Sequence, residues 1–219
     1  MRSYDDPCGV ARALDVVGER WALLVVRDLL LGPKRFTDLA AGLPGLSQNV
    51  LSQRLRDLEA AGVVARRTLG PPSGARVYEL TPAGAELREV VTALARWGSR
   101  EPRVIGGALG VDALALALTT TFDAAAAGGR RAVLALHVGA DRLTARVADG
   151  RVEVVRGDPA DLDHAEPDAV VTADAAALQA VVFGGAPLPE GAVTGDAGTV
   201  DWFVRLFPRP VPRPVPRTA

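Results

Sequence analysis

The leucines between Ser47 and Gly62 predict a surface helix with one apolar side. They recur at i, i+4 and i+7, the spacing that places side chains on one face of a helix: Leu51, Leu55 and Leu58. Ser47 stands where an N-cap belongs, and Gly62 stands where a helix commonly ends. We therefore expect one helix here, with its leucine face buried.

The opposite face of this helix is polar. At about 100° per residue, Asn49, Gln53 and Arg56 point away from the leucines, and Ser52 and Asp57 flank them. Asn and Gln amides match the donor and acceptor pair of adenine, and Arg matches guanine. The face predicts a helix that reads DNA bases; an ordinary amphipathic surface helix is the alternative.

The preceding residues predict three shorter helices. The apolar run that forms the second of them ends at Gly32 and Pro33, and residues 42–45 make a tight turn before Ser47. Two helices joined by a short glycine-containing turn form a helix-turn-helix, with the later one as the recognition helix. The three predicted helices are Gly9 to Val17, Arg20 to Leu31 and Phe36 to Ala41.

The residues after Gly62 predict a β-hairpin and then a long helix. Two short apolar runs, 63–67 and 76–80, flank a Gly/Pro turn, which is the pattern of a hairpin. Its Arg66, Arg67 and Arg76 would place positive charge beside the recognition helix, as in a winged helix; the alternative is that they only keep the hairpin soluble.

The helix that Pro82 begins carries an apolar face as far as Trp97. We expect this face either to pack on a second subunit or to pack within its own domain. Its members are Leu87, Val90, Val91, Leu94 and Trp97.

The second half of the chain predicts a second domain with a sheet. One helix is expected over 111–127, and three strands joined by tight turns follow it. The strands are expected over 131–139, 141–149 and 151–157, a fourth over 168–174, a helix over 175–185, a short strand over 192–194 and a last helix over 199–207.

Charge is distributed unevenly between the two halves. The net charge of the chain is −1, but residues 1–103 hold 15 Lys and Arg against 12 Asp and Glu, and the rest hold 10 against 14. Between Lys34 and Arg76, seven basic residues face three acidic ones. A local basic stripe is the electrostatic footprint of phosphate binding.

The composition excludes several classes of protein. Hydrophobic residues make up 48% of the chain, but no apolar run is long enough to span a bilayer. The start lacks the apolar core of a signal peptide, so we expect a cytoplasmic protein without a membrane partner. The single cysteine, Cys8, rules out an internal disulfide framework.

The first hundred residues resemble the HxlR-type winged-helix transcriptional regulators of bacteria. The resemblance rests on Cys8, the runs LDVVGERWALLVVRDLLLGPKRF and LPGLSQNVLSQRLRDLEAAGVV, and YELTPAG. It implies a homodimer, joined by the N-terminal segment and the helix from Pro82, on double-stranded DNA with a pseudo-palindromic operator. It implies that base edges face Gln48, Asn49, Ser52 and Gln53, to which the helix pattern adds Arg56. It further implies phosphate contacts from Lys34, Arg35, Thr37, Arg66, Arg67 and Arg76.

Cys8 is a candidate redox or electrophile sensor, because some members of this family sense oxidants at that position. The carboxylates of Asp5 and Asp6 are expected to raise the thiol pKa and oppose reactivity, whereas Arg12 acts in the other direction. The alternative is a small residue buried at the dimer interface.

The second half resembles the sterol-carrier-protein-type lipid-binding fold, through DAVVTADAAALQAVVFGG and the run from Gly195 to Phe207. The fold class is thus α+β: a winged helix-turn-helix, residues 1–103, then an antiparallel-type sheet covered by helices, residues 104–208, joined near Gly106 and Gly107. Such a fold implies a tunnel for a small hydrophobic ligand, although each wall residue could equally be plain core. The wall candidates are Phe122, Phe183, Trp202, Phe203 and Phe207.

Catalytic and metal-binding patterns are absent from the sequence. His137 and His164 have no partner at ligand spacing, and the acidic loop 158–168 lacks the glycine and the ligand series of a calcium loop. We expect no enzyme, no cofactor and no metal site, and a mobile Pro/Arg tail over 209–219. A ligand-responsive regulator is the leading hypothesis. The alternatives are redox control through Cys8, and a second domain that is an enzyme or lipid shuttle, with DNA binding secondary.

Overall fold

The computed structural model describes residues 3–101, 107–162 and 166–213, in two compact units that are taken separately below. The units are residues 1–91 and 92–219, so the boundary falls inside a helix, whereas the sequence placed it after residue 103. Gly106 and His164 lie outside the described residues.

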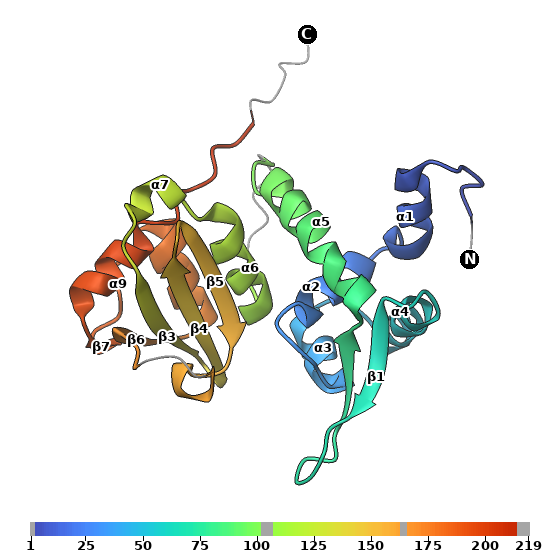
Figure 1. The fold of residues 1–219 in the computed structure, drawn as a ribbon, viewed down its shortest axis with the longest axis horizontal. Coiled ribbons are helices and arrows are strands. Elements are labelled where there is room, and N and C mark those ends of the chain that lie inside the picture. Colours follow the sequence, from blue (N-terminus) through green and yellow to red (C-terminus); the bar gives the residue numbers. More distant parts are fainter. Residues whose placement is uncertain (1–2, 102–106, 163–165, 214–219) are drawn as a thin grey trace. The chain divides into compact units, whose positions relative to one another are not determined.

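The first unit is a helix-turn-helix followed by a two-stranded hairpin (Figure 1). The leucine face of α4 is buried, since Leu51, Leu55 and Leu58 are at most 1% exposed. The predicted burial of the leucine face is thus confirmed. The elements are α1 Gly9–Val17, α2 Ala22–Leu29, α3 Phe36–Gly42, α4 Gln48–Ala60, β1 Val64–Thr68, β2 Arg76–Leu80 and α5 Pro82–Gly98, of which α5 continues into the second unit.

Helix α2 is shorter than the sequence predicts. It begins at Ala22 rather than Arg20, because Trp21 has a left-handed backbone with φ of 79° and cannot continue a right-handed helix. Its other end is Leu29 rather than Leu31. The apolar side chains of α2 nevertheless lie in the core as predicted, with Val25 and Val26 fully buried.

The hairpin gains a short extension that the sequence did not predict. Strands β1 and β2 pair antiparallel, and Lys34 adds an isolated bridge to Tyr78 on the far side of β2. The Lys34 N–H donates to the Tyr78 carbonyl at 2.9 Å, and the Tyr78 N–H donates back at 2.8 Å. The residues before α3 are therefore held against the wing.

The start of α5 is joined tightly to the hairpin. Thr81 donates from its hydroxyl to the Gly62 carbonyl at 2.6 Å and accepts from the Gly84 N–H at 3.0 Å. Gly84 and Val91 are buried, whereas Val90 and Leu94 are exposed. The helix therefore packs by one side and leaves part of its apolar face uncovered.

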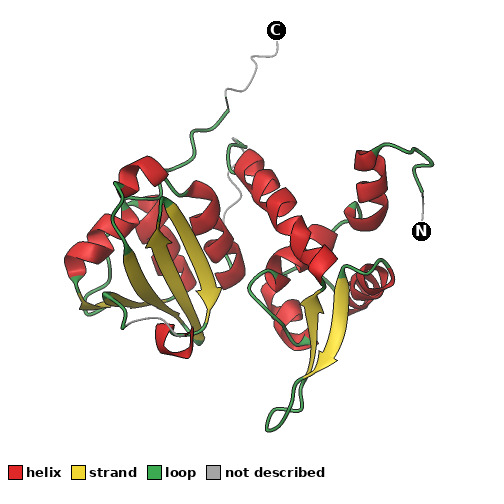
Figure 2. Cartoon of the chain, in the orientation of Figure 1, coloured by secondary structure: helices red, strands yellow, loops and turns green. Residues whose placement is uncertain are grey.

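The second unit is a five-stranded sheet with helices packed against it (Figures 1 and 2). The strand order is β5-β4-β3-β6-β7. The elements are α6 Val111–Thr121, α7 Ala124–Ala127, β3 Ala132–Val138, β4 Asp141–Ala148, β5 Arg151–Arg156, η1 Pro159–Leu162, β6 Ala169–Ala173, α8 Ala175–Gln179, η2 Ala180–Gly184, β7 Val193–Gly195 and α9 Ala197–Val204.

The sheet is mixed, not purely antiparallel as predicted. Strands β3 and β6 run parallel, because the connection through η1 returns the chain to the end of the sheet at which β3 starts. The Asp168 N–H, just before β6, donates to the carbonyl of Val133 near the start of β3 at 2.8 Å. Hairpin patterns in the sequence predict only antiparallel neighbours, so they do not predict a parallel pair that forms through a long connection.

Two helices predicted as continuous are interrupted. Phe122 is extended between α6 and α7, and the Asp123 carboxylate accepts from the N–H groups of Ala125 and Ala126, which starts a new helix. The other helix, predicted over 175–185, changes from α8 into the π-helical turn η2 at Ala180. Among the described residues, no helix has the length and apolar character to cross a bilayer.

Candidate nucleic-acid interface and ligand pocket

Helix α4 presents its amide side chains to solvent from a buried leucine base. Ser47 caps the helix, with its hydroxyl accepting from the Val50 N–H at 3.3 Å. Gln48, Asn49 and Gln53 are exposed. Because the leucine face is locked in the core, these side chains project from a rigid support, as base reading requires.

The Gln53 amide is engaged at both ends by its own helix. Its Nε2 donates to Asp57 Oδ1 at 2.7 Å, and its Oε1 accepts from Arg56 Nη2 at 2.7 Å. Within the described chain, the Asn49 side chain has no such partner. The Asn49 amide is therefore available to an external partner, whereas Gln53 would first have to exchange two internal hydrogen bonds.

Arg54 is a positioning residue that the sequence reading missed. Its guanidinium lies 3.2 Å from Asp57 on α4 and 3.5 Å from Glu19, between α1 and α2. Only 15% of its side chain is exposed. The i, i+3 spacing of Arg54 and Asp57 was a readable signal, but the contact with Glu19 depends on the tertiary fold.

The basic residues just before α3, Lys34 and Arg35, lie next to the hairpin of β1 and β2. The Arg35 guanidinium donates to the Ser73 hydroxyl in the hairpin loop at 3.4 Å. Arg35 and Thr37 are exposed, and Lys34 is half-buried. The fold thus brings this short stretch to the hairpin, about forty residues further along the chain.

The three wing arginines differ in how they are paired. Arg66 lies 2.8 Å from a Glu59 carboxylate oxygen, and Arg67 lies 2.9 Å from one of Glu79. Arg76 is exposed and, in the part of the chain that the structure describes, has no ion-pair partner. Neighbouring carboxylates partly neutralise the first two, so Arg76 offers the least compensated charge to a phosphate.

Cys8 lies exposed at the N-terminal end of α1. The backbone N–H groups of Val10 and Ala11, at the start of α1, lower the thiol pKa below its ordinary value. The sequence leaves the direction open, since Asp5 and Asp6 are expected to raise the thiol pKa and Arg12 to lower it; the N–H groups at the start of α1 decide it. The Asp6 carboxylate instead accepts from the Cys8 backbone N–H at 2.8 Å.

The aromatic wall candidates of the second unit separate into core and pocket. Phe203 and Phe207 are each 2% exposed and pack on one another with ring centroids 4.8 Å apart. Phe122 packs on Phe207 at 6.1 Å, and Trp202 stacks under the Arg130 guanidinium at 4.6 Å. Phe183 alone of the five lines the pocket of about 400 Å³ beside α8 and η2.

The histidine that the structure describes has a structural partner. His137 Nε2 lies 2.8 Å from Asp158 Oδ1, both partly exposed. Within the described ranges, no three His, Cys, Asp or Glu side chains come together in a way that could hold a metal ion. Asp163 and His164 of the acidic loop lie outside those ranges.

Comparison with known proteins places the first unit. The profile of the HxlR-like helix-turn-helix family matches residues 16–103. The chain is 39% identical over 89 residues to the uncharacterized HTH-type transcriptional regulator YvaP of Bacillus subtilis. This alignment covers 40% of this chain and 82% of YvaP. The HTH-type transcriptional regulator YodB of the same bacterium is 33% identical over 88 residues, with coverage of 40% and 79%.

Among solved structures, the redox regulator HypR in its oxidized form is 32% identical, with a TM-score of 0.41, and the match covers 44% of this chain and 100% of that one. The family match ends at residue 103, so it does not reach the sheet of the second unit. With its helix-turn-helix core, its hairpin and these relatives, the chain belongs to the HxlR-like helix-turn-helix family of transcriptional regulators.

Proposed function

We propose that this chain acts as a homodimer that reads an operator with α4 and responds to a small hydrophobic ligand in its second unit. The observation that carries the DNA assignment is the exposed amide face of α4, held on a buried leucine base beside a basic hairpin. This is the arrangement of a recognition helix and wing. Base edges face Gln48, Asn49, Ser52, Gln53 and Arg56, and phosphates face Lys34, Arg35, Thr37, Arg66, Arg67 and Arg76.

The dimer surface that we infer is the uncovered apolar face of α5, together with α1. Large apolar side chains are rarely left exposed in a group on a monomer, and here they follow one helix face. The α5 members are Val90, Leu94 and Trp97, exposed by 50%, 48% and 59%, and α1 adds Val10 and Leu14 at 68% and 41%.

Placing a charge in this face is expected to separate the dimer. Leu94→Glu should shift the protein to a monomer and lower its affinity for an operator duplex selected from a random library by at least about tenfold, because one recognition helix reads only half of a two-fold site. Sedimentation velocity and fluorescence anisotropy measure the two effects.

Ala85→Glu is the matched control. Ala85 is exposed on the opposite side of the same helix, so this variant adds an equal charge away from the proposed surface. It should remain dimeric with unchanged affinity. A Leu94→Glu protein that stayed dimeric would remove α5 from the interface.

The ligand part of the proposal rests on the second unit. That half of the chain is acidic, resembles the sterol-carrier-type fold and contains the pocket beside Phe183. We infer that the ligand that regulates DNA binding by the first unit binds in this pocket of the second unit.

Redox control through Cys8 is a second candidate function, favoured by the exposed thiol and its lowered pKa. A lowered pKa increases the thiolate fraction near neutral pH, and the thiolate is the reactive form. Alkylation of Cys8 by iodoacetamide at pH 7 should therefore be faster than alkylation of a short, unstructured peptide containing the same residues 3–13.

Operator binding provides the functional test of this second candidate. Diamide is expected to release the protein from its operator, and Cys8→Ser should not respond. If the Cys8→Ser protein were released as readily as the wild type, redox control through this residue would be excluded.

A further inference from the structure

We propose that the pocket beside α8 and η2 binds a planar aromatic molecule that carries a carbonyl oxygen. This pocket would be the ligand site of the proposed function. Its effect on regulation rests on that proposed function, whereas binding itself does not. The residues that carry the argument are Ala108, Ala176, Gln179, Phe183 and Gly184.

The size and lining of the pocket favour a small aromatic body. Its volume of about 400 Å³ lies near the lower end of the usual range for small-molecule sites, so it suits one or two fused rings rather than a long lipid chain. Alanine and glycine residues line most of it, and half-buried Phe183 supplies one ring face. An aromatic ligand can stack or pack edge-on against that ring.

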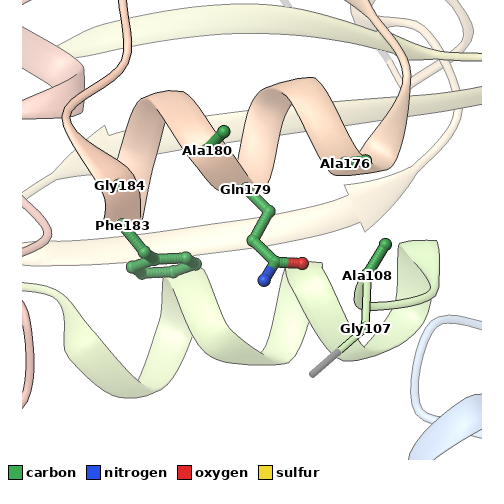
Figure 3. Close-up of a pocket in the computed structure, with 7 residues that line it drawn as sticks. All are labelled: Gly107, Ala108, Ala176, Gln179, Ala180, Phe183 and Gly184. Atoms are coloured by element: carbon green, nitrogen blue, oxygen red, sulfur yellow. The ribbon is translucent and has the colours of Figure 1, made fainter. Parts of the chain in front are cut away.

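The side-chain amide of Gln179 supplies a hydrogen-bond donor, which favours a ligand that carries an acceptor oxygen. Its Oε1 accepts from the Leu109 backbone N–H at 2.7 Å, which fixes the rotation of the amide. Figure 3 shows the side chains of Gln179 and Phe183 pointing toward α6, with the amide oxygen turned toward Ala108 and the amide nitrogen turned away from it. Among the described residues, Nε2 has no hydrogen-bond partner, so it remains a donor for a ligand carbonyl.

The backbone at the pocket has an uncommon conformation. Residues 180–184 form a π-helical turn, in which Val181 and Val182 are buried in the core while Ala180 and Phe183 line the pocket. Single π-helical turns within helices occur frequently at functional sites, because the widened turn re-aims the side chains that follow. The turn is thus a second observation that favours a binding site here.

The position of the pocket in the chain suggests how binding could matter. Gly107 and Ala108 line it, and they are the first described residues after the segment that leads from the DNA-binding half. A ligand held between Ala108 and Phe183 would restrain the residues that lead into α6. This step depends on the proposed ligand-responsive function, whereas binding itself does not.

The test compares two matched probes on the full chain. We expect 1-acetonaphthone to bind roughly threefold to tenfold more tightly than 1-ethylnaphthalene, which has a similar ring and chain but no oxygen, because one net hydrogen bond separates them. Titration calorimetry measures both affinities. Equal affinity for the two probes would overturn the role of Gln179, and binding of neither probe would overturn the site.

Three variants locate the binding. Gln179→Glu keeps the acceptor for Leu109 but removes the donor, so it should abolish the preference for the ketone. Ala176→Phe should fill the pocket and abolish binding of both probes. Ala126→Phe, at an exposed alanine of α7 in the same unit, is the control and should bind like the wild type. Undiminished binding by a folded Ala176→Phe protein would place the probe elsewhere and overturn the proposal.

Operator affinity with and without the probe separates this inference from the proposed function. If 1-acetonaphthone binds with the expected variant pattern but operator affinity is unchanged, the site stands and ligand-responsive regulation fails. If the operator is bound normally but neither probe binds, the site fails and DNA recognition stands.

Discussion

Replacing Asn49 and Gln53 together by alanine is expected to lower operator affinity by at least about 30-fold at fixed salt. Each good bidentate contact between an amide and an adenine is worth about 1–3 kcal/mol of discrimination, so losing two costs at least about 2 kcal/mol. The leucine face of α4 does not include either residue, so the helix should remain folded. Fluorescence anisotropy with the selected operator duplex measures the loss.

The two residues should contribute unequally. The Asn49 side chain is exposed, whereas the Gln53 amide bonds to Asp57 and Arg56 and must leave both to reach a base. Asn49→Ala alone should therefore account for the larger share. Full affinity in the double variant would show that this face does not read bases.

Arg76→Ala is the contrasting control for this experiment. A phosphate contact carries no sequence information, so losing one from each subunit of the dimer should weaken binding to all duplexes and reduce the slope of log affinity against log salt by about two. The amide double variant should keep the wild-type slope and lose its preference for the operator. The two patterns distinguish base reading from backbone binding.

Gly84→Ala is expected to destabilise the first unit by about 1–3 kcal/mol or more. A Cβ at Gly84 would lie 2.0 Å from the carbonyl oxygen of Val63, which is backbone and cannot rotate away. Either α5 or the start of β1 must shift, and overpacking of this kind is costly. Urea denaturation followed by circular dichroism measures the change.

Gly98→Ala in the same helix is the matched control. An added Cβ there meets nothing within 4 Å, so the better helix propensity of alanine should leave stability unchanged or raise it by up to about 1 kcal/mol. A Gly84→Ala protein as stable as the wild type would mean that this joint is looser than the structure indicates.

Local patterns predicted most of the first unit because they report on local physics. The i, i+4, i+7 leucines of α4 are buried as expected, and α1 has the predicted bounds of Gly9–Val17. The hairpin strands β1 and β2 also formed around the Gly/Pro turn. Periodicity and turn chemistry depend on neighbouring residues, so one sequence suffices for them.

Several features of the fold differ from the sequence predictions, and some of them arise where distant parts of the chain meet. The parallel pairing of β3 with β6 joins strands separated by two others, and no hairpin signal marks it. The left-handed Trp21 shortened α2, and a capping carboxylate at Asp123 divided a run of helix-forming residues. The strand pairing and the break at Asp123, whose N–H donates to the distant Leu206 carbonyl at 2.8 Å, depend on tertiary contacts, whereas the Asp123 cap and the Trp21 backbone are local features.

Within the candidate sites, the sequence by itself determined which chemical groups are available. It named the amides and arginines of the DNA-binding half, and it named Phe183 and Cys8. Residue types and helical spacing are properties of the chain alone. They indicated that a basic half with base-matching side chains precedes an acidic half.

Only the tertiary structure decided which of these groups are ready to act. It paired Arg66 with Glu59 of α4 and Arg67 with Glu79 of β2, whereas the groups that engage Gln53 and Cys8 lie on their own helices. Phe203 was assigned to the core, and Phe183 to the pocket with Gln179. Ion pairs between elements and burial in the core depend on contacts between distant residues, and these exist only once the chain has folded.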